Sequence, residues 1–565
     1  MKIGATLLLL LFLFALPAHQ SFFSRSPLYA NKVIIASDSQ LASKVGKEIY
    51  AQGGNVVDAA VATAFAMAVT FPAAGNIGGG GFLVYHDNKG NATTIDFREK
   101  APDAATQNMF VDAKGKYIQD LAHTGLLSVG VPGTVAGLHL AHSKYGKLPW
   151  AKVVEPAVKL AEEGFAFPYD LYLGAKYYEK QWRSYPSTAR VMFKANGDFY
   201  QPGEVWKQPD LAATLKRIRD KGRDGFYKGE TAEKLAAFFK QNKGLITKGD
   251  LEQYQAVERK PITGTYRGYT VFSMPPPSSG GVTLIQMLNI LEGYDLKKIG
   301  YNSAEYVHLL SETMRRAYAN RAEYLGDPDF NPAMPVDKLI SKDYANVLRA
   351  GINLEKAATS DSTRFAKGYE GTHTTHLSVM DAEGNGVSLT YTIEQGFGSQ
   401  IIADGLGFFL NNEMGDFNAI PNVTNSQGDI GTPPNFVKAG KRMLSSMTPA
   451  ILTKDGRVVM VVGAEGGRTI ITTVLQTILN CLDHGMSIGE AMDAGRIHHQ
   501  WLPDRIDYEK FSLSADTQEI LKRKGHKLFE TSYQGSATGI LYNAEMKALT
   551  GAVDSRFTHE TAEGY

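Results

Sequence analysis

Residues 375–381 and 387–393 form the pattern that constrains the fold most. Two runs of β-forming residues flank the turn segment AEGNG at residues 382–386, and such turns between two runs are typical of a β-hairpin. A hairpin centred near Gly384 returns Thr392 to within a few residues of Thr374. The chain is therefore predicted to contain an antiparallel sheet in which these two threonines lie close together.

Thr374 itself follows a polar, loop-like segment at residues 359–373. A threonine hydroxyl is a weak nucleophile that needs a base, and a free α-amine on the same residue is one known solution. That solution requires cleavage of the chain before Thr374, and an exposed polar loop is a suitable place for a chain break. Alternatively, Thr374, Thr390 and Thr392 are only β-forming residues on a half-solvated strand. Spacing leaves both interpretations open.

A second pattern is a strand followed by a pair of glycines and then by a helix. Residues 458–462 (VVMVV) predict a buried strand, Gly466 and Gly467 a turn, and residues 470–481 a helix. Two backbone N–H groups beside a helix N-terminus can stabilise a developing oxyanion, a contact often worth roughly 3 kcal/mol in acyl transfer. The alternative is a tight turn into a helix with no chemical role.

Acceptors and donors of hydrogen bonds gather between these two patterns. They are Glu413, Asp416, Ser445 and Ser446, and Arg98 ends a strand predicted earlier in the chain. An ammonium group binds best among carboxylates, whereas a carboxylate binds best to arginine and hydroxyl donors. Together these side chains suit a zwitterionic ligand, although each alone is better explained as a surface charge, a turn residue or a helix cap.

The remainder of the chain predicts helices that cover a sheet. Glycines at residues 75–81 precede a strand at 82–85, whereas a dinucleotide-binding loop needs its glycines between a strand and a helix. A nucleotide site is therefore not expected there. Amphipathic runs predict helices at residues 150–164, 210–221, 231–242, 282–291 and 303–324.

The N-terminus has the composition of a secretory signal. Lys2 precedes an apolar run at residues 7–16 and then PAHQ at 17–20, which matches the three regions of such a signal. A membrane anchor is the alternative, but this run falls short of the roughly 20 apolar residues that span a bilayer. We expect residues 1–20 to be the signal and the protein to be periplasmic or secreted. The only cysteine is Cys481, so no internal disulfide can form.

Several other functional classes lack support. The net charge of +1 gives no electrostatic case for nucleic acid. His373 and His376 lie across a loop-to-strand boundary, and the adjacent pair at 498–499 would point to different sides. No Gly-x-Ser-x-Gly pentapeptide occurs. We expect neither a metal nor another cofactor.

Several motifs in order resemble the γ-glutamyltranspeptidase family, also called glutathione hydrolase. The resemblance extends from about residue 30 to Tyr565. The motifs are DFRE at 96–99, GVPGTVAG at 130–137, MPPPSSGG at 274–281, TTH at 374–376, TYT at 390–392, LNNEM at 410–414, LSSM at 444–447 and the pair Gly466-Gly467.

The resemblance implies an N-terminal nucleophile hydrolase of the α+β class, folded as a four-layer αββα sandwich. One precursor would cleave itself between His373 and Thr374. The large subunit, residues 21–373, and the small subunit, residues 374–565, would then stay associated as a heterodimer that forms one domain. Thr374 would be the nucleophile in both self-cleavage and catalysis, its new α-amine the general base, and Thr392 its hydrogen-bond partner.

The same resemblance implies the reaction and the substrate contacts. The γ-glutamyl amide of glutathione and related compounds would be cleaved through an acyl-enzyme, and the glutamyl group transferred to water, amino acids or dipeptides. The implied contacts are Gly466 and Gly467 for the oxyanion, Arg98, Ser445 and Ser446 for the α-carboxylate, and Glu413 with Asp416 for the α-ammonium.

Glu394 departs from the commonest form of the family, in which many members have asparagine contacting the glutamyl group. A carboxylate there should favour the ammonium end of the substrate and disfavour its carboxylate. Two alternative functions remain. One is a related acylase or poly-γ-glutamate transpeptidase of the same fold, against which Arg98 argues by offering a partner for a free α-carboxylate. The other is an uncleaved, inactive γ-glutamyl-binding protein.

Overall fold

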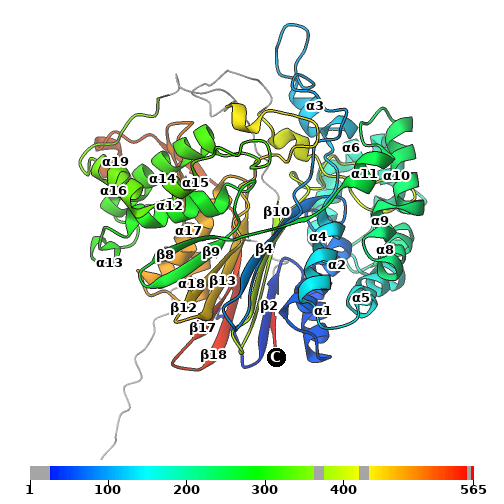
Figure 1. Cartoon of the computed structure of the whole chain (residues 1–565), viewed down its shortest axis with the longest axis horizontal. Coiled ribbons are helices and arrows are strands. Elements are labelled where there is room, and N and C mark those ends of the chain that lie inside the picture. The colour runs from blue at the N-terminus through cyan, green and yellow to red at the C-terminus, as the bar shows by residue number, and fades with distance from the viewer. Residues whose placement is uncertain (1–25, 362–373, 419–431, 557–560) are drawn as a thin grey trace, which may run out of the picture.

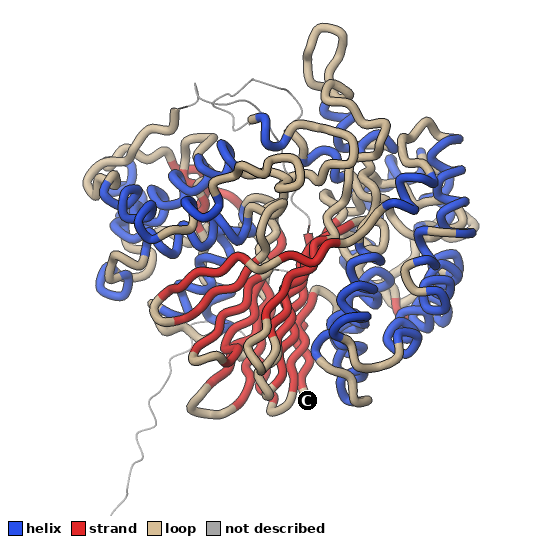
Figure 2. The backbone as a smooth tube through the Cα atoms, in the orientation of Figure 1, coloured by secondary structure: helices blue, strands red, loops and turns tan. Residues whose placement is uncertain are grey.

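Two β-sheets pack face to face between two layers of helices in the computed structural model (Figures 1 and 2). The structure describes residues 26–361, 374–418, 432–556 and 561–565. The expected signal at residues 1–20 and His373 at the expected cleavage site lie outside the described residues. The four-layer αββα prediction is confirmed.

Each of the two large sheets has seven strands, all paired antiparallel. The first sheet has the order β1 (Leu28–Ala30), β18 (Ala548–Val553), β17 (Ser536–Asn543), β13 (Arg457–Glu465), β12 (Ala450–Lys454), β9 (Tyr269–Ser273) and β8 (Ile262–Tyr266). The second has the order β19 (Thr561–Gly564), β2 (Val33–Ser37), β10 (Thr374–Asp381), β11 (Gly386–Thr392), β3 (Gly80–His86), β4 (Ala92–Asp96) and β7 (Val257–Arg259).

An apolar core fills the space between the sheets. Ile34, Val84 and Met380 of the second sheet pack with Ile451 and Val461 of the first. Full burial of such a side chain stabilises the fold by about 1.5–3 kcal/mol. Because side chains alternate along a strand, this core fixes which residues of β10 face the other sheet.

One helical layer covers the outer face of the sheet that contains β10. Its centre is α2, all of whose residues are buried, and Asn55 and Asp58 close its N-terminus in a capping box. The layer comprises α1 (Gln40–Ala51), α2 (Val56–Thr70), α4 (Thr134–Tyr145), α5 (Trp150–Glu163), α6 (Tyr169–Ser184), α7 (Pro186–Met192), α8 (Pro209–Lys221), α9 (Asp224–Tyr227), α10 (Gly229–Gln241) and α11 (Lys248–Gln253).

The second helical layer covers the sheet that contains β13. Ser303 caps α14 by accepting a hydrogen bond from the Tyr306 N–H. The layer comprises α12 (Gly280–Leu291), α13 (Leu296–Ile299), α14 (Ala304–Tyr324), α15 (Val336–Leu339), α16 (Lys342–Ala350), α17 (Thr469–Leu482), α18 (Ile488–Asp493) and α19 (Ala515–Arg523).

Short elements complete the described part of the chain. They are α3 (Gln119–His123), the 3-10 helices η1 (Leu126–Ser128), η3 (Glu413–Asp416) and η4 (Pro433–Asn435), the small sheet β14 (Ile497–His498), β15 (Ile506–Glu509) and β16 (Leu528–Thr531), and the pair β5 (Phe165–Ala166) and β6 (Val205–Trp206).

The predicted hairpin is confirmed as β10 and β11, and Thr374 lies directly opposite Thr392. The inward face of β10 also carries His376, whose ring occupies space that a side chain at Gly463 would fill, since a Cβ there would lie 2.2 Å from its Cε1. Burial lowers the pKa of His376 to about 3, so the ring is neutral at physiological pH. Leu377 and Val379 pack against the helices on the other face.

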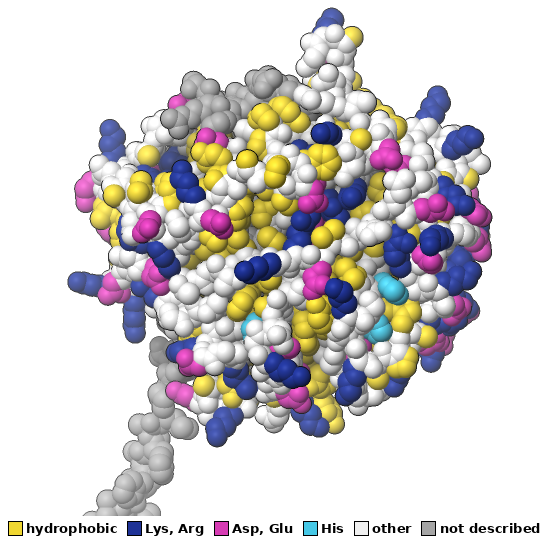
Figure 3. Space-filling model, viewed as in Figure 1, with side chains coloured by type: hydrophobic (Ala, Val, Ile, Leu, Met, Phe, Trp, Pro, Cys, Tyr) yellow, Lys and Arg dark blue, Asp and Glu magenta, His cyan; other side chains and the backbone are white. Residues whose placement is uncertain are grey.

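Charged side chains of both signs lie on the face of the molecule seen in Figure 3. Lys and Arg side chains alternate with Asp and Glu around the edges of the visible face (Figure 3). Among the described residues, no helix combines the length and apolar character that crossing a bilayer requires. Within the same residues, no group of three or more His, Cys, Asp or Glu side chains is arranged to hold a metal ion.

Candidate active site

A cavity of about 20 Å³ lies at the head of β10. That space holds about one water molecule, so the cavity is small in this structure. We call it the Thr374 pocket. Every predicted site residue within the described chain lines it except Gly466. The lining residues are Arg98, Thr374, Thr392, Glu394, Glu413, Asp416, Ser445, Ser446, Met447, Gly467 and Ile470.

Thr374 and Thr392 meet at the open end of the hairpin. Thr374 is 5% exposed, and its position in β10 directs its side chain between the two sheets. The Thr392 hydroxyl accepts a hydrogen bond of 2.8 Å from the Glu394 N–H. The end of β11 is therefore fixed in position beside the candidate nucleophile.

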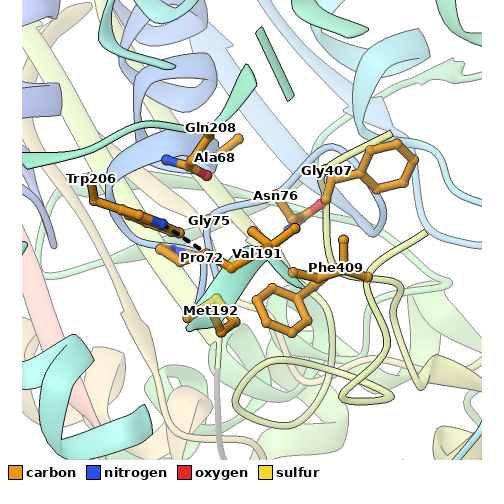
Figure 4. A pocket seen from close by; sticks show the side chains of 12 residues that line it. Ala68, Pro72, Gly75, Asn76, Val191, Met192, Trp206, Gln208, Gly407 and Phe409 are labelled. Atoms are coloured by element: carbon orange, nitrogen blue, oxygen red, sulfur yellow. Dashed lines mark hydrogen bonds between the residues drawn. The ribbon is translucent and has the colours of Figure 1, made fainter. Parts of the chain in front are cut away.

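Asn76 provides a further anchor that sequence reasoning missed. Its side-chain amide donates to the Thr392 carbonyl at 3.0 Å, and its oxygen accepts from the Gly79 N–H and the Thr134 hydroxyl at 2.8 Å. A separate cavity of about 10 Å³ lies beside Asn76 and is lined mainly by apolar groups (Figure 4). At most one water fits there, and none of the described residues that line it is charged.

Gly466 and Gly467 connect β13 to α17, as the sequence predicted. Both have positive φ, +124° and +58°, which other residues rarely adopt. A Cβ at Gly466 would also lie 2.7 Å from the Gly535 Cα. Their carbonyls accept bonds from the Thr469 and Ile470 N–H groups at the start of α17. The Gly467 backbone therefore lines the pocket at the positive end of a helix dipole.

Arg98 lies at the centre of the charges. It is fully buried and its guanidinium forms ion pairs with Glu413 at 2.5 Å, with Asp416, and with Glu99 at 3.5 Å. It also donates to the carbonyls of Met443 and Leu444, both at 3.3 Å. Three carboxyl groups and two carbonyls therefore surround the Arg98 guanidinium.

The carboxyl groups around Arg98 outnumber it. Burial raises the pKa of Glu99 to about 8, although Arg98 opposes that shift. Burial likewise raises the pKa of Glu413 well above its usual range. Removing charged groups from water favours their neutral forms. Burial in the pocket therefore favours the protonated forms of Glu99 and Glu413.

The loop with Ser445 and Ser446 is held from α12 and α14. Ser279 donates its hydroxyl to the Ser445 carbonyl at 2.7 Å, and Ser278 donates to the Met447 carbonyl at 2.5 Å. Arg321, on α14, donates to the Ser446 hydroxyl at 2.9 Å and to that of Ser279 at 2.8 Å. The serines of the motif at 274–281 therefore support the pocket without lining it.

Glu394 enters the pocket with a positive φ of +79°. Its carboxylate lies 3.5 Å from Nδ1 of His123, whose other nitrogen contacts the Tyr117 hydroxyl at 3.1 Å. Burial lowers the pKa of His123 to about 4, so its ring is neutral at physiological pH. His123 lies on the short helix α3, and no periodic pattern in the sequence indicated that it would contact Glu394.

Comparison with known proteins agrees with this geometry. The family description "Gamma-glutamyltranspeptidase" matches residues 42–564. A "Glutathione hydrolase proenzyme" of Pseudomonas sp. (strain A14) is 47% identical over 509 residues, which are 89% of this chain and 88% of the relative. Both matches extend across Thr374 and the whole pocket.

Solved structures show the same fold. Cephalosporin acylase from Bacillus halodurans superposes with a TM-score of 0.84 at 27% identity, covering 98% of this chain and 99% of that chain. The Helicobacter pylori γ-glutamyltranspeptidase structure aligns with a TM-score of 0.55 at 46% identity, covering 56% of this chain and 91% of that chain. Because the family pattern and a relative at this identity extend over most of its length, the chain belongs to the γ-glutamyltranspeptidase family.

Proposed function

We propose that this protein is a self-processing γ-glutamyl hydrolase and transpeptidase that acts on glutathione and related γ-glutamyl amides through a Thr374 acyl-enzyme. The observation that carries the proposal is the assembly of Thr374, Thr392, Gly467 and the charged side chains around Arg98 in one pocket. Family membership supports the same reaction class.

The reaction follows from the chemistry of these groups. The Thr374 hydroxyl attacks the γ-carbonyl while the α-amine of Thr374, freed by cleavage, accepts the proton. The Gly466 and Gly467 N–H groups stabilise the oxyanion, which such donors can favour by roughly 3 kcal/mol. The amine leaves with the proton, and water or an amino-acid or dipeptide amine then releases the glutamyl group. Thr392 orients the attacking hydroxyl.

Donor binding requires an exchange of ion pairs. A zwitterionic glutamyl group brings one ammonium and one carboxylate into a pocket where Arg98 is already paired with Glu413 and Asp416. The two carboxylates turn to the ammonium while Arg98, Ser445 and Ser446 turn to the substrate carboxylate. The exchange replaces the ion pairs of Arg98 by ion pairs with the ligand, and the side chains that line the small pocket must move apart to admit it.

Maturation would give two chains from one precursor, residues 21–373 and 374–565, that remain together as one folded unit. The name "proenzyme" of the Pseudomonas relative supports processing. Strands β2 and β3 of the first segment pair directly with β10 and β11 of the second. This pairing would hold the heterodimer together after cleavage. Export by the signal at 1–20 is part of the same proposal.

An acylase with another amide substrate is the second candidate, because the cephalosporin acylase structure covers 98% of this chain with a TM-score of 0.84. Its 27% identity is well below the 47% of the glutathione hydrolase proenzyme. Arg98 and the nearby carboxylates also favour a substrate with both a free carboxylate and a free ammonium.

The test combines mass analysis with an activity assay on the purified full chain. We expect two chains, the second beginning at Thr374, and release of the amine from γ-glutamyl anilide that is accelerated by glycylglycine. One uncut chain with no release would overturn the proposal. Two chains that cleave a cephalosporin side chain but not the anilide would establish the acylase alternative.

A further inference from the structure

His123 lies directly behind Glu394, and the reaction described above gives it no role. It is the last residue of the short helix α3 and is 5% exposed. Its Nδ1 lies 3.5 Å from a carboxylate oxygen of Glu394, and its Nε2 lies 3.1 Å from the hydroxyl of Tyr117. Glu394 lines the Thr374 pocket, whereas His123 and Tyr117 do not. A chain of polar contacts therefore leads outwards from the pocket wall.

The place of the His123 ring is fixed by Gly415 and Asn412. A Cβ on Gly415 would lie 2.3 Å from Cε1 of His123 and 2.4 Å from its Nδ1, so glycine is required there to leave room for the ring. The side-chain amide of Asn412 donates to the His123 carbonyl at 3.0 Å and accepts from the Gln395 N–H at 3.1 Å. One side chain therefore holds the backbone of His123 beside the backbone that follows Glu394.

The neighbours of His123 determine which ring nitrogen carries the proton. Burial lowers the pKa of His123 to about 4, although Asp416 opposes that shift, so the ring is neutral. A neutral imidazole has one N–H donor and one acceptor nitrogen, whereas an ionised carboxylate only accepts. We therefore assign the proton to Nδ1, facing Glu394, and Nε2 accepts from the Tyr117 hydroxyl. The reverse tautomer would direct a lone pair at the carboxylate.

A neutral donor suits this position better than a charged one. Burial raises the pKa of Glu413, and the nearby Glu99 and Glu394 raise it further, so carboxyl groups already crowd this side of the pocket. An N–H directed at Glu394 favours the ionised form of that carboxyl group. A lysine or a protonated histidine would do the same, but its charge would compete with a ligand ammonium. The neutral ring of His123 supports the carboxylate and leaves its charge for the ligand.

We propose that His123 is a positioning residue for donor recognition, whose Nδ1–H keeps the Glu394 carboxylate ionised and directed at the α-ammonium of the γ-glutamyl donor. Tyr117 fixes the tautomer that this requires. The inference rests on the proposed function and assigns part of the preference for donors with a free α-amino group to a contact outside the pocket wall. Because His123 touches no reacting atom, its loss weakens recognition of the ammonium more than the chemical step.

The experiment compares two ligands that differ only in the α-amino group, L-glutamate and glutarate, as inhibitors of γ-glutamyl anilide hydrolysis. In His123→Leu, we expect the donor KM and the inhibition constant of L-glutamate to rise about threefold to fivefold, with a smaller change in kcat. The inhibition constant of glutarate should stay within about twofold of the wild-type value, because glutarate has no ammonium. His123→Asn is the matched control, since it keeps an N–H donor near the Nδ1 position, and it should restore most of the wild-type preference.

A double-mutant cycle tests whether His123 acts through Glu394. In a Glu394→Gln background, His123→Leu should change the donor KM by less than about twofold, because the carboxylate that it supports is gone. Tyr117→Phe keeps the proposal testable if His123→Leu does not mature, since it removes only one hydroxyl. It should raise the donor KM about twofold and leave the inhibition constant of glutarate unchanged.

Hydrolysis by the wild type separates this inference from the proposed function. If the wild type hydrolyses the anilide and His123→Leu weakens L-glutamate and glutarate equally, the role of His123 is structural and the assignment is wrong, while the proposed function stands. The full effect of His123→Leu in the Glu394→Gln background would also overturn the assignment, as would a Tyr117→Phe variant that matches the wild type. A wild type that does not hydrolyse the anilide would overturn both.

Discussion

The Thr374 pocket and a larger cavity beside α6, here called the α6 cavity, differ in size and in lining. The Thr374 pocket has about 20 Å³ of space and ion pairs around Arg98, whereas the α6 cavity has about 520 Å³ and apolar walls with carboxyl groups. We propose that the first recognises both charges of the donor. The volume of a cavity alone therefore does not identify the site, because the candidate nucleophile lines the smaller one.

Thr374→Ala should have the largest effect, because it removes the nucleophile from the Thr374 pocket. We expect a single uncleaved chain and a loss of donor turnover of more than about three orders of magnitude. Mass analysis and anilide release measure the two effects. Thr374→Ser keeps a hydroxyl and is the matched control, so it should retain slower cleavage and turnover. Normal two-chain maturation of Thr374→Ala would contradict the assignment.

Arg98→Met should affect donor binding and stability together. Loss of a charge-assisted contact of roughly 2–3 kcal/mol should raise the donor KM by about one to two decades more than it lowers kcat. Leaving Glu413 buried without its cation should also lower the free energy of unfolding by about 3–5 kcal/mol.

The double variant Arg98→Met/Glu413→Gln separates these two consequences. It should recover much of the stability in urea denaturation while the donor KM stays high. Recovery of both properties would mean that Arg98 only neutralises the acidic residues and does not contact the substrate.

Glu394→Gln should have an intermediate effect confined to the donor. Removing one of the carboxylates available to the substrate ammonium should raise the donor KM about fivefold to tenfold. The kcat should fall less than the KM rises, because Glu394 is proposed to bind the donor ammonium and not to react. Steady-state kinetics with the anilide varied measures both constants. An unchanged donor KM would contradict the assignment.

Glu99→Gln should have the smallest effect, and this effect concerns the pH dependence of stability. The pKa of Glu99 is raised by burial to about 8 from an ordinary 4.5, so the folded protein holds a proton that the unfolded chain has lost. The stabilisation is full below about pH 4.5 and is lost as pH rises to about 8. Glu99→Gln should flatten that slope in urea midpoints, whereas Glu48→Gln on the exposed face of α1 should not. If Glu99→Gln shows the same slope of urea midpoint against pH as the wild type, the raised pKa of Glu99 is contradicted.

Local patterns predicted much of the fold and most of the pocket. The turn at residues 382–386 placed Thr392 opposite Thr374, and the strand, glycine pair and helix around Gly466 were found as predicted. Family motifs identified the residues around Arg98. These features could be predicted because each depends on neighbours in the sequence or on a motif of several residues.

The contacts between segments far apart in the sequence could not be predicted from such local patterns. Neither the pairing of Arg98 with Glu413 and Asp416 nor the support of Ser446 by Arg321 follows from spacing, because the partners lie in separate elements. His123 gave no periodic signal. The α6 cavity is built from turns and helix ends, so no single pattern could predict it.

The acyl-enzyme on Thr374 is the central claim and can be measured directly. The purified protein is quenched with acid during turnover of γ-glutamyl anilide, digested and analysed by mass spectrometry. We predict that the peptide beginning at Thr374 gains one glutamyl group on its hydroxyl, and that adding glycylglycine before the quench lowers the labelled fraction. A glutamyl group on any other residue, or turnover with no labelled peptide under conditions where hydrolysis of the ester limits the rate, would contradict the account.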